Sequence, residues 1–158
     1  MPTPLFEAVK RGNHAEVQEL LKKEVQVNIG RGPSTSHRQP MSPLYLAVIK
    51  KDLRSVQLLL KNSEIDVDKS FNGMTPLAQA FASYMHSDSG RDRYVMGLIA
   101  RELRQHGANL VMAQSEYVQW CEKRGLPTGL GTADLASLKQ SGPSPRAGEP
   151  PYAGALRL

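Results

Sequence analysis

The sequence has one cysteine, no long hydrophobic run and few aromatic residues. A lone Cys121 cannot form a disulfide within the chain and cannot build a cysteine-rich zinc site, so a cytoplasmic protein is expected. The apolar stretches are a few residues long, far below the roughly 20 residues that cross a bilayer, and predict no membrane insertion. Residues 1–4 lack the basic flank and apolar core of a secretory signal. A chain of 158 residues suffices for one ordinary domain.

The net charge of +5 comes from one part of the chain. Residues 1–61 carry ten basic and five acidic side chains, whereas residues 62–110 and 111–158 are nearly balanced. A local basic face attracts an acidic partner. The excess forms no continuous basic run, so we expect an acidic protein surface as the partner rather than a nucleic acid.

Groups that carry catalysis or hold a metal are scattered. His14, His37, His86 and His106 show none of the spacings of a helical metal motif, and Cys121 lies in no local nucleophile motif with His106. Cys121 is therefore interpreted as a buried structural residue. The sequence predicts no catalytic site, no metal site and no cofactor.

A short motif occurs three times along the chain. Its pattern is a hydroxyl residue, Pro, Leu, two variable residues and Ala, and the copies are Thr3-Pro4-Leu5-Phe6-Glu7-Ala8, Ser42-Pro43-Leu44-Tyr45-Leu46-Ala47 and Thr75-Pro76-Leu77-Ala78-Gln79-Ala80. The first two copies also share a Val and a Leu at fixed later offsets, at Val17 and Leu20 and at Val56 and Leu59. A fixed recurrence of this kind indicates a repeat protein.

The motif also predicts where helices begin. Ser or Thr accepts the free amide groups of a first turn, and a following Pro has no amide to lose. Helices should therefore begin after Thr3, Ser42 and Thr75, with the first helices ending at residues 12–13 and 51–52. Second helices are expected at about 15–23 and 53–61. Each pair has one apolar side, which must stack against a neighbouring pair to be buried.

These features resemble the ankyrin repeat family, whose 33-residue unit opens with TPLHxA. Ser42 and Thr75 are one such unit apart, and His106-Gly107-Ala108-Asn109 matches a later part of the unit. The resemblance implies an all-α, ankyrin-like α-solenoid of three helix-turn-helix repeats at about 2–30, 41–68 and 74–110. Phe6, Tyr45 and Ala78 replace the signature His, so its inter-repeat hydrogen bonds are expected to be absent.

Two insertions interrupt the repeat spacing. Residues 29–40 lengthen the first hairpin, as a mobile surface loop or a recognition loop. Residues 83–94 lie between the helices of repeat three, where they predict a protruding helical hairpin with both helices lengthened; the alternative is an irregular loop. Tyr84, Tyr94 and Val95 are expected to pack in that extension.

The last part of the chain departs from the repeat pattern. A capping helix is predicted at 115–125, with Ser115 as its N-cap, Gly125 as its stop, and Tyr117, Trp120 and Cys121 turned inward. It completes a domain of residues 1–125. The Pro/Gly-rich tail at 126–158 is predicted to be largely disordered, with one weak helix at 132–140.

The resemblance also implies where a partner binds. In this family the concave face combines hairpin tips with the exposed side of the first helices. The matching positions here are Lys10, Arg11, Arg38, Gln39, Met41, Ile49, Lys50, Phe71, Asn72, Met74, Ala82 and Ser83. We therefore predict a noncatalytic protein-protein interaction module or adaptor. A host-targeted effector of a pathogen or symbiont, acting in the host cytosol, is an alternative that uses the same module.

Overall fold

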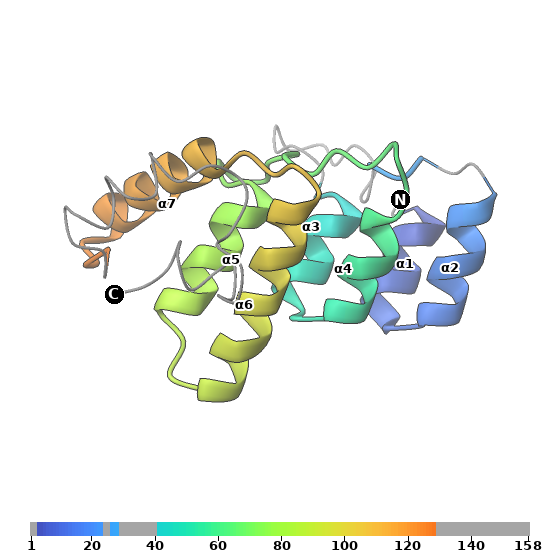
Figure 1. Cartoon of the computed structure of the whole chain (residues 1–158), viewed down its shortest axis with the longest axis horizontal. Helices are drawn as coiled ribbons and strands as arrows, with labels where there is room; N and C mark the ends of the chain where they lie inside the picture. Colours follow the sequence, from blue (N-terminus) through green and yellow to red (C-terminus); the bar gives the residue numbers. More distant parts are fainter. Residues whose placement is uncertain (1–2, 24–25, 29–40, 129–158) are drawn as a thin grey trace.

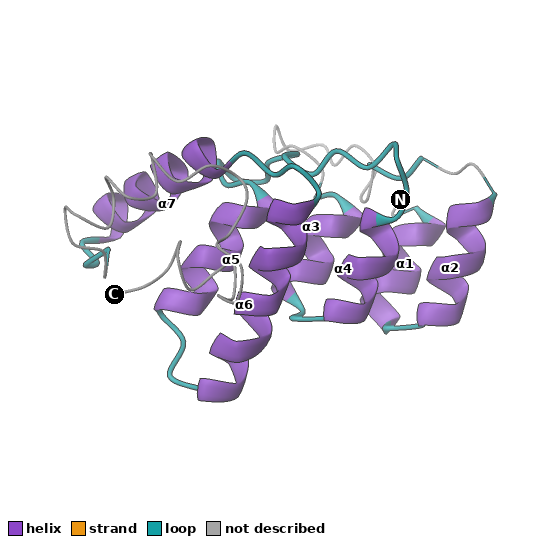
Figure 2. Cartoon of the chain, in the orientation of Figure 1, coloured by secondary structure: helices purple, strands orange, loops and turns teal. Residues whose placement is uncertain are grey.

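The computed structural model describes residues 3–23, 26–28 and 41–128, and helices dominate these ranges (Figure 2). In chain order the helices are α1 (Pro4–Arg11), α2 (His14–Lys22), α3 (Pro43–Ile49), α4 (Leu53–Leu60), α5 (Pro76–Met85), α6 (Gly90–Gln105) and α7 (Leu110–Arg124). The fold is all-α, as predicted. The insertion at 29–40 and residues 129–158, with the helix expected at 132–140, lie outside the described residues.

The predicted helix starts are confirmed. Thr3, Ser42 and Thr75 have extended backbone angles, and each side chain accepts a hydrogen bond from the amide three residues later. The donor-acceptor distances are 3.1–3.3 Å. Pro follows each cap at the first helical position. Local capping chemistry therefore fixes the first helix of all three repeats.

The turns inside repeats one and two also lie where the sequence placed them. Gly12 ends α1 in the left-handed region, and the Asn13 side chain then caps α2. Lys51 holds the corresponding position in repeat two with φ of 58°, and Asp52 caps α4. A residue with a Cβ atom adopts this conformation at a cost of about 1–2 kcal/mol. The stacking of the repeats must offset that cost.

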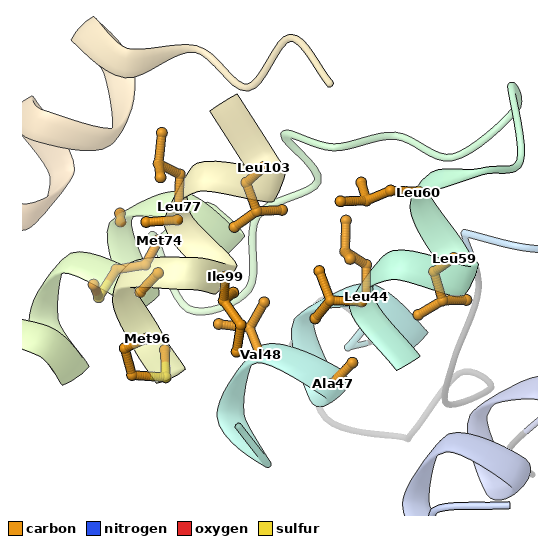
Figure 3. Packing of buried hydrophobic residues seen from close by; sticks show 14 of the residues in the cluster. Leu44, Ala47, Val48, Leu59, Leu60, Met74, Leu77, Met96, Ile99 and Leu103 are labelled. Atoms are coloured by element: carbon orange, nitrogen blue, oxygen red, sulfur yellow. The ribbon is translucent and has the colours of Figure 1, made fainter. Parts of the chain in front are cut away.

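The helices pack as three pairs, α1 with α2, α3 with α4 and α5 with α6, and the pairs stand side by side (Figure 1). One continuous cluster of buried apolar side chains joins them, and Figure 3 shows part of it between α3, α4, α5 and α6. Leu59 and Leu103 are fully buried, and Leu20 packs half-buried against the cluster. Burying a leucine contributes about 1.5–3 kcal/mol. Each pair thus covers the apolar side of its neighbour.

The third pair is longer than the others, as the insertion at 83–94 predicted. α5 has 10 residues and α6 has 16, against seven to nine in the helices of repeats one and two. The extra length lies mainly in α6, whose first residues follow the Ser89 cap, and the hairpin extends beyond the other turns (Figure 1). Tyr84 and Val95 are half-buried, but Tyr94 is 60% exposed. The expectation that Tyr94 packs there is wrong, because it lies on the outer side of α6.

Hydrogen bonds connect the repeats despite the loss of the signature His. The Tyr45 hydroxyl donates to Gln79 Oε1 at 3.0 Å. Asn28 donates to the Glu64 carbonyl at 2.7 Å and accepts from the Asp66 amide at 2.6 Å. The repeats are therefore joined by hydrogen bonds other than those of the signature His: Tyr45 connects repeats two and three, and Asn28 connects repeats one and two.

The capping helix begins earlier than predicted. α7 begins at Leu110, where Asn109 caps it by accepting from the Met112 amide at 3.0 Å, and Ser115 lies exposed within the helix. Gly125 ends it, as expected. Because Asn109 directly follows the end of repeat three, no hairpin separates α6 from α7. α7 is inclined to α5 and α6 and packs on α5 (Figure 1).

Candidate partner-binding groove

A groove lies between α3, the hairpin before α5, and α7. It encloses a cavity of about 260 Å³. Its apolar lining comes from Tyr45, Ile49, Phe71, Met74 and Trp120. Its polar lining comes from Asn72, Gln79, Glu116, Gln119, Lys123 and Arg124, with Gly73 at the hairpin turn. We call this the α3–α7 groove.

The hairpin that forms one wall of the groove is a tight two-residue turn. The amides of Phe71 and Met74 each donate to the other residue's carbonyl, at 2.9 and 3.2 Å. Asn72 and Gly73 between them both have positive φ, at 54° and 80°. This Asn-Gly pairing is the sequence that favours a type I′ hairpin turn. The turn fixes Phe71 against Tyr45, with ring centroids 5.3 Å apart.

The opposite wall is α7, which is anchored to repeat three. Glu116 Oε1 accepts a hydrogen bond from the Thr75 amide at 3.1 Å. Tyr117 is fully buried and meets the ring of Phe81 edge-on, with centroids 6.5 Å apart. Cys121, one turn further along, is also fully buried. One side of α7 is therefore committed to the core, and Trp120, Lys123 and Arg124 are left along the groove.

The Tyr45 hydroxyl stays neutral at ordinary pH. Burial, and then the nearby carboxylate of Glu116, raise the pKa of Tyr45 to about 12. The protonated hydroxyl donates to Gln79 Oε1, while Gln79 Nε2 donates to Ser83 Oγ at 3.2 Å. The groove floor is thus held by a short chain of hydrogen bonds rather than by a charge.

Cations gather at the open end of α7. The guanidinium carbon of Arg124 lies over the Trp120 ring, 4.6 Å from its centroid. Lys123 lines the groove beside it. The lining contains one carboxylate, Glu116, and an oxygen of it is engaged by the Thr75 amide. The groove therefore combines an aromatic surface with positive charge.

A second hollow lies on the other side of Trp120, lined by Ala82, Ser83 and His86 among others. His86 Nε2 lies 3.2 Å from the Tyr117 hydroxyl and 3.7 Å from Cys121 Sγ. Burial, with the Cys121 thiol as a lesser cause, raises the pKa of Tyr117 above its usual value. The Cys121 thiol is fully buried, as predicted. The exposed His86 thus joins the end of α5 to the buried Tyr117 and Cys121 of α7.

The structure brings part of the predicted partner-binding set together. Ile49, Phe71 and Asn72 line the α3–α7 groove, and Ser83 lies half-buried in the second hollow. Met74 also lines the α3–α7 groove and Ala82 the second hollow, although the two residues are only 4% and 3% exposed. The reason for this low exposure is that Met74 packs in the core and α7 covers the first-helix side of repeat three. Met41 is half-buried, and Arg38 and Gln39 lie outside the described residues.

The basic members of the set have different surroundings. Lys10 is exposed. Arg11 pairs with Glu16 at 3.0 Å. The Lys50 ammonium donates to the carbonyls of Val9, at 3.3 Å, and of Lys10. A cation at this position stabilises the C-terminus of α1. Lys50 therefore has a structural task between repeats one and two.

Sequence reasoning missed the part of the groove that α7 provides. Glu116, Gln119, Lys123 and Arg124 were absent from the predicted set, and Trp120 was assigned to the core although it is half-buried. The available signal was the missing hairpin after Asn109. Because no such hairpin lies between α6 and α7, α7 cannot pack where the first helix of a fourth repeat would lie.

Neither a metal site nor a membrane span is found in the part of the chain that the structure describes. No group of three or more metal-ligating side chains comes together within residues 3–23, 26–28 and 41–128. In the same ranges, every helix is too short or too polar to span a bilayer.

Stacked helical pairs with capped first helices and short hairpins define an α-solenoid repeat protein. The family model described as ankyrin repeats (3 copies) matches residues 1–71, so this part of the chain carries ankyrin repeats. The match ends at the hairpin before Thr75; the cap at Thr75 and the pairing of α5 with α6 continue the same architecture. No curated protein matches the chain. Ankyrin repeats generally mediate protein-protein interactions and are typically noncatalytic.

Proposed function

We propose that the chain is a noncatalytic adaptor module that binds a partner protein along the face formed by α1, α3 and the α3–α7 groove. The observation that carries the proposal is the groove itself, which brings apolar and polar side chains from three separate segments together. Ile49 is 41% exposed at its edge, although it is a large apolar residue. Apolar and aromatic side chains beside arginine are typical of protein interfaces. Lys10 on the same series of first helices adds attraction for an acidic surface.

The proposal includes no cofactor, and it places the protein in the cytoplasm. Its one cysteine is a buried free thiol, which is the ordinary state in a reducing compartment. Fractionation of cells that express the tagged full chain tests this location. Recovery in a secreted or membrane fraction would contradict it.

The binding face is tested with Ile49→Glu against a matched control, Val111→Glu. Both residues are exposed apolar side chains on helices, but Val111 lies on α7 away from the groove lining. Proteins captured by the full chain are identified by mass spectrometry, and each is purified and titrated against the three chains. We expect Ile49→Glu to weaken binding about tenfold or more, because it puts a charge where an apolar contact forms, and Val111→Glu to leave it unchanged.

Two results would contradict this function. Equal binding of a purified partner to Ile49→Glu and to the unaltered chain would remove the proposed face. Failure of every purified candidate to bind the unaltered chain directly would remove the adaptor role. Circular dichroism of both variants establishes that they are folded.

A further inference from the structure

We propose that the α3–α7 groove recognises a short acidic segment of the partner that carries one large apolar side chain. The inference rests on the proposed function and specifies what that face binds. It assigns the apolar side chain to the cavity beside Ile49, Phe71 and Trp120, and the acidic side chains to Lys123 and Arg124.

The size of the cavity indicates a single side chain as its occupant. At about 260 Å³ it is smaller than the roughly 300–1,000 Å³ of sites that enclose whole small molecules. Its apolar walls come from α3, the hairpin and α7, so a side chain that enters contacts all three segments. An aliphatic or aromatic anchor with chain continuing on both sides fits these limits better than a compact cofactor.

The walls are held in place before any partner arrives. The two hydrogen bonds between Phe71 and Met74 fix the hairpin, and the Glu116 contact to the Thr75 amide fixes α7. Tyr117 and Cys121 anchor the buried side of the same helix. A preformed site spends less binding free energy on ordering itself, which favours recognition of a short segment.

The charge of the groove selects acidic neighbours for that anchor. Lys123 and Arg124 line the cavity and are exposed, whereas an oxygen of its one carboxylate, on Glu116, already accepts from a backbone amide. Arg124 is positioned by the Trp120 ring beneath it. A guanidinium held in this way offers a carboxylate two parallel donors. A basic or neutral segment would leave these cations without a matching charge.

The experiment uses a displayed library of random twelve-residue peptides selected on the full chain. We expect the enriched peptides to share a large apolar residue flanked by Asp or Glu. The strongest peptide is then synthesised without tryptophan and titrated, with the emission of Trp120 as the signal. Trp120 is the one tryptophan of the sequence and lines the groove, so its emission responds to a peptide that binds beside it.

The matched variants are Lys123→Glu/Arg124→Glu and Lys22→Glu/Lys23→Glu. Each reverses two adjacent cations at the end of a helix, so both lose similar helix-end stabilisation, but α2 lies at the opposite end of the stack from α7 (Figure 1). We expect the double substitution on α7 to weaken peptide binding about tenfold or more, and the double substitution on α2 to change it less than twofold.

Several outcomes would overturn the inference. These are a selection that yields no peptide or peptides without acidic residues, and equal binding by the two double variants. A dimer in sedimentation that dissociates in the Lys123→Glu/Arg124→Glu variant would assign the groove to a second copy of the chain instead. In any of these cases the adaptor function still stands if Ile49→Glu weakens the binding of a purified partner protein. The two proposals can therefore fail separately.

Discussion

The hydroxyl of Tyr45 on α3 donates a hydrogen bond to Oε1 of Gln79 on α5, 3.0 Å away, and so joins repeat two to repeat three. Tyr45 holds the position at which the ankyrin motif carries His. Gln79 is itself oriented by its donation to Ser83 Oγ. A substitution that breaks the family pattern thus keeps a polar connection between neighbouring repeats.

Replacing Tyr45 by Phe should lower the free energy of unfolding by about 1 kcal/mol or slightly more, because a buried hydrogen bond is lost and Gln79 Oε1 keeps no phenol donor. Urea unfolding followed by circular dichroism measures the change. Tyr94→Phe is the control, since Tyr94 is 60% exposed and should alter stability by less than about 0.5 kcal/mol. Equal stability of the two variants would contradict this account.

The helix starts could be predicted from the sequence because capping is local. Thr3, Ser42 and Thr75 each need only their own next three residues to form the observed hydrogen bond. The start of α7 could not be found in the same way. Ser115 looks like a cap in isolation, but Asn109 supplies the cap once the end of repeat three is in place.

The candidate site was only partly predictable, for a different reason. Ile49 and Asn72 follow from repeat register, and both line the groove. Met74 and Ala82 follow from the same register but are buried, because register says nothing about where α7 packs. The missed residues Lys123 and Arg124 enter the groove through that tertiary contact alone.

Replacing Asp52 by Asn should make stability less sensitive to acid. Burial raises the pKa of Asp52, but hydrogen bonds from Ser55 and His14 outweigh it, and the net pKa is lower than usual. The folded state therefore binds this proton less readily than the unfolded chain, so the contribution is present at neutral pH and is lost as the pH falls below about 4.

The comparison is made by urea unfolding at a series of pH values. At neutral pH we expect Asp52→Asn to be less stable by about 1.5 kcal/mol, the low end of the range for hydrogen bonds to a charged group, because Asp52 is half-buried. The difference should shrink in acid, where Asp52 is protonated. Asp88→Asn, in the exposed turn before α6, serves as control and should not show this convergence. A gap that persists unchanged at low pH would rule out the proposed role of the carboxylate.

Lys50→Gln should lower stability by about 0.5–1 kcal/mol, since the ammonium at the end of α1 is lost. Lys61→Gln is the matched control: Lys61 also follows a helix, α4, and is exposed. Thermal unfolding of both variants checks the prediction. If the two melt together, the contact between Lys50 and the α1 carbonyls contributes no stability.

Gly73→Ala should destabilise the chain by about 1 kcal/mol, because Gly73 has φ of 80° and a Cβ atom disfavours that conformation. A methyl group there meets no atom within 4 Å, so strain in the turn is the single cause. Gly90→Ala is the control, since Gly90 lies in α6 with open space around it, and alanine should there be neutral or stabilising. Chemical denaturation of both variants measures the two changes. Destabilisation of Gly90→Ala alone would contradict the role given to Gly73.

Because α7 begins directly after Asn109, the two ends of the binding face differ. The two-residue turn at Phe71–Met74 precedes α5, but none like it lies between α6 and α7, and α7 packs across repeat three instead. Among the described residues, α7 therefore closes the Trp120 end of a path along the first helices, and α1 lies at the other end of that path. Added residues on an extended ligand that follows this path will lengthen its contact on the α1 side only, so affinity should grow with peptide length in one orientation and not in the other.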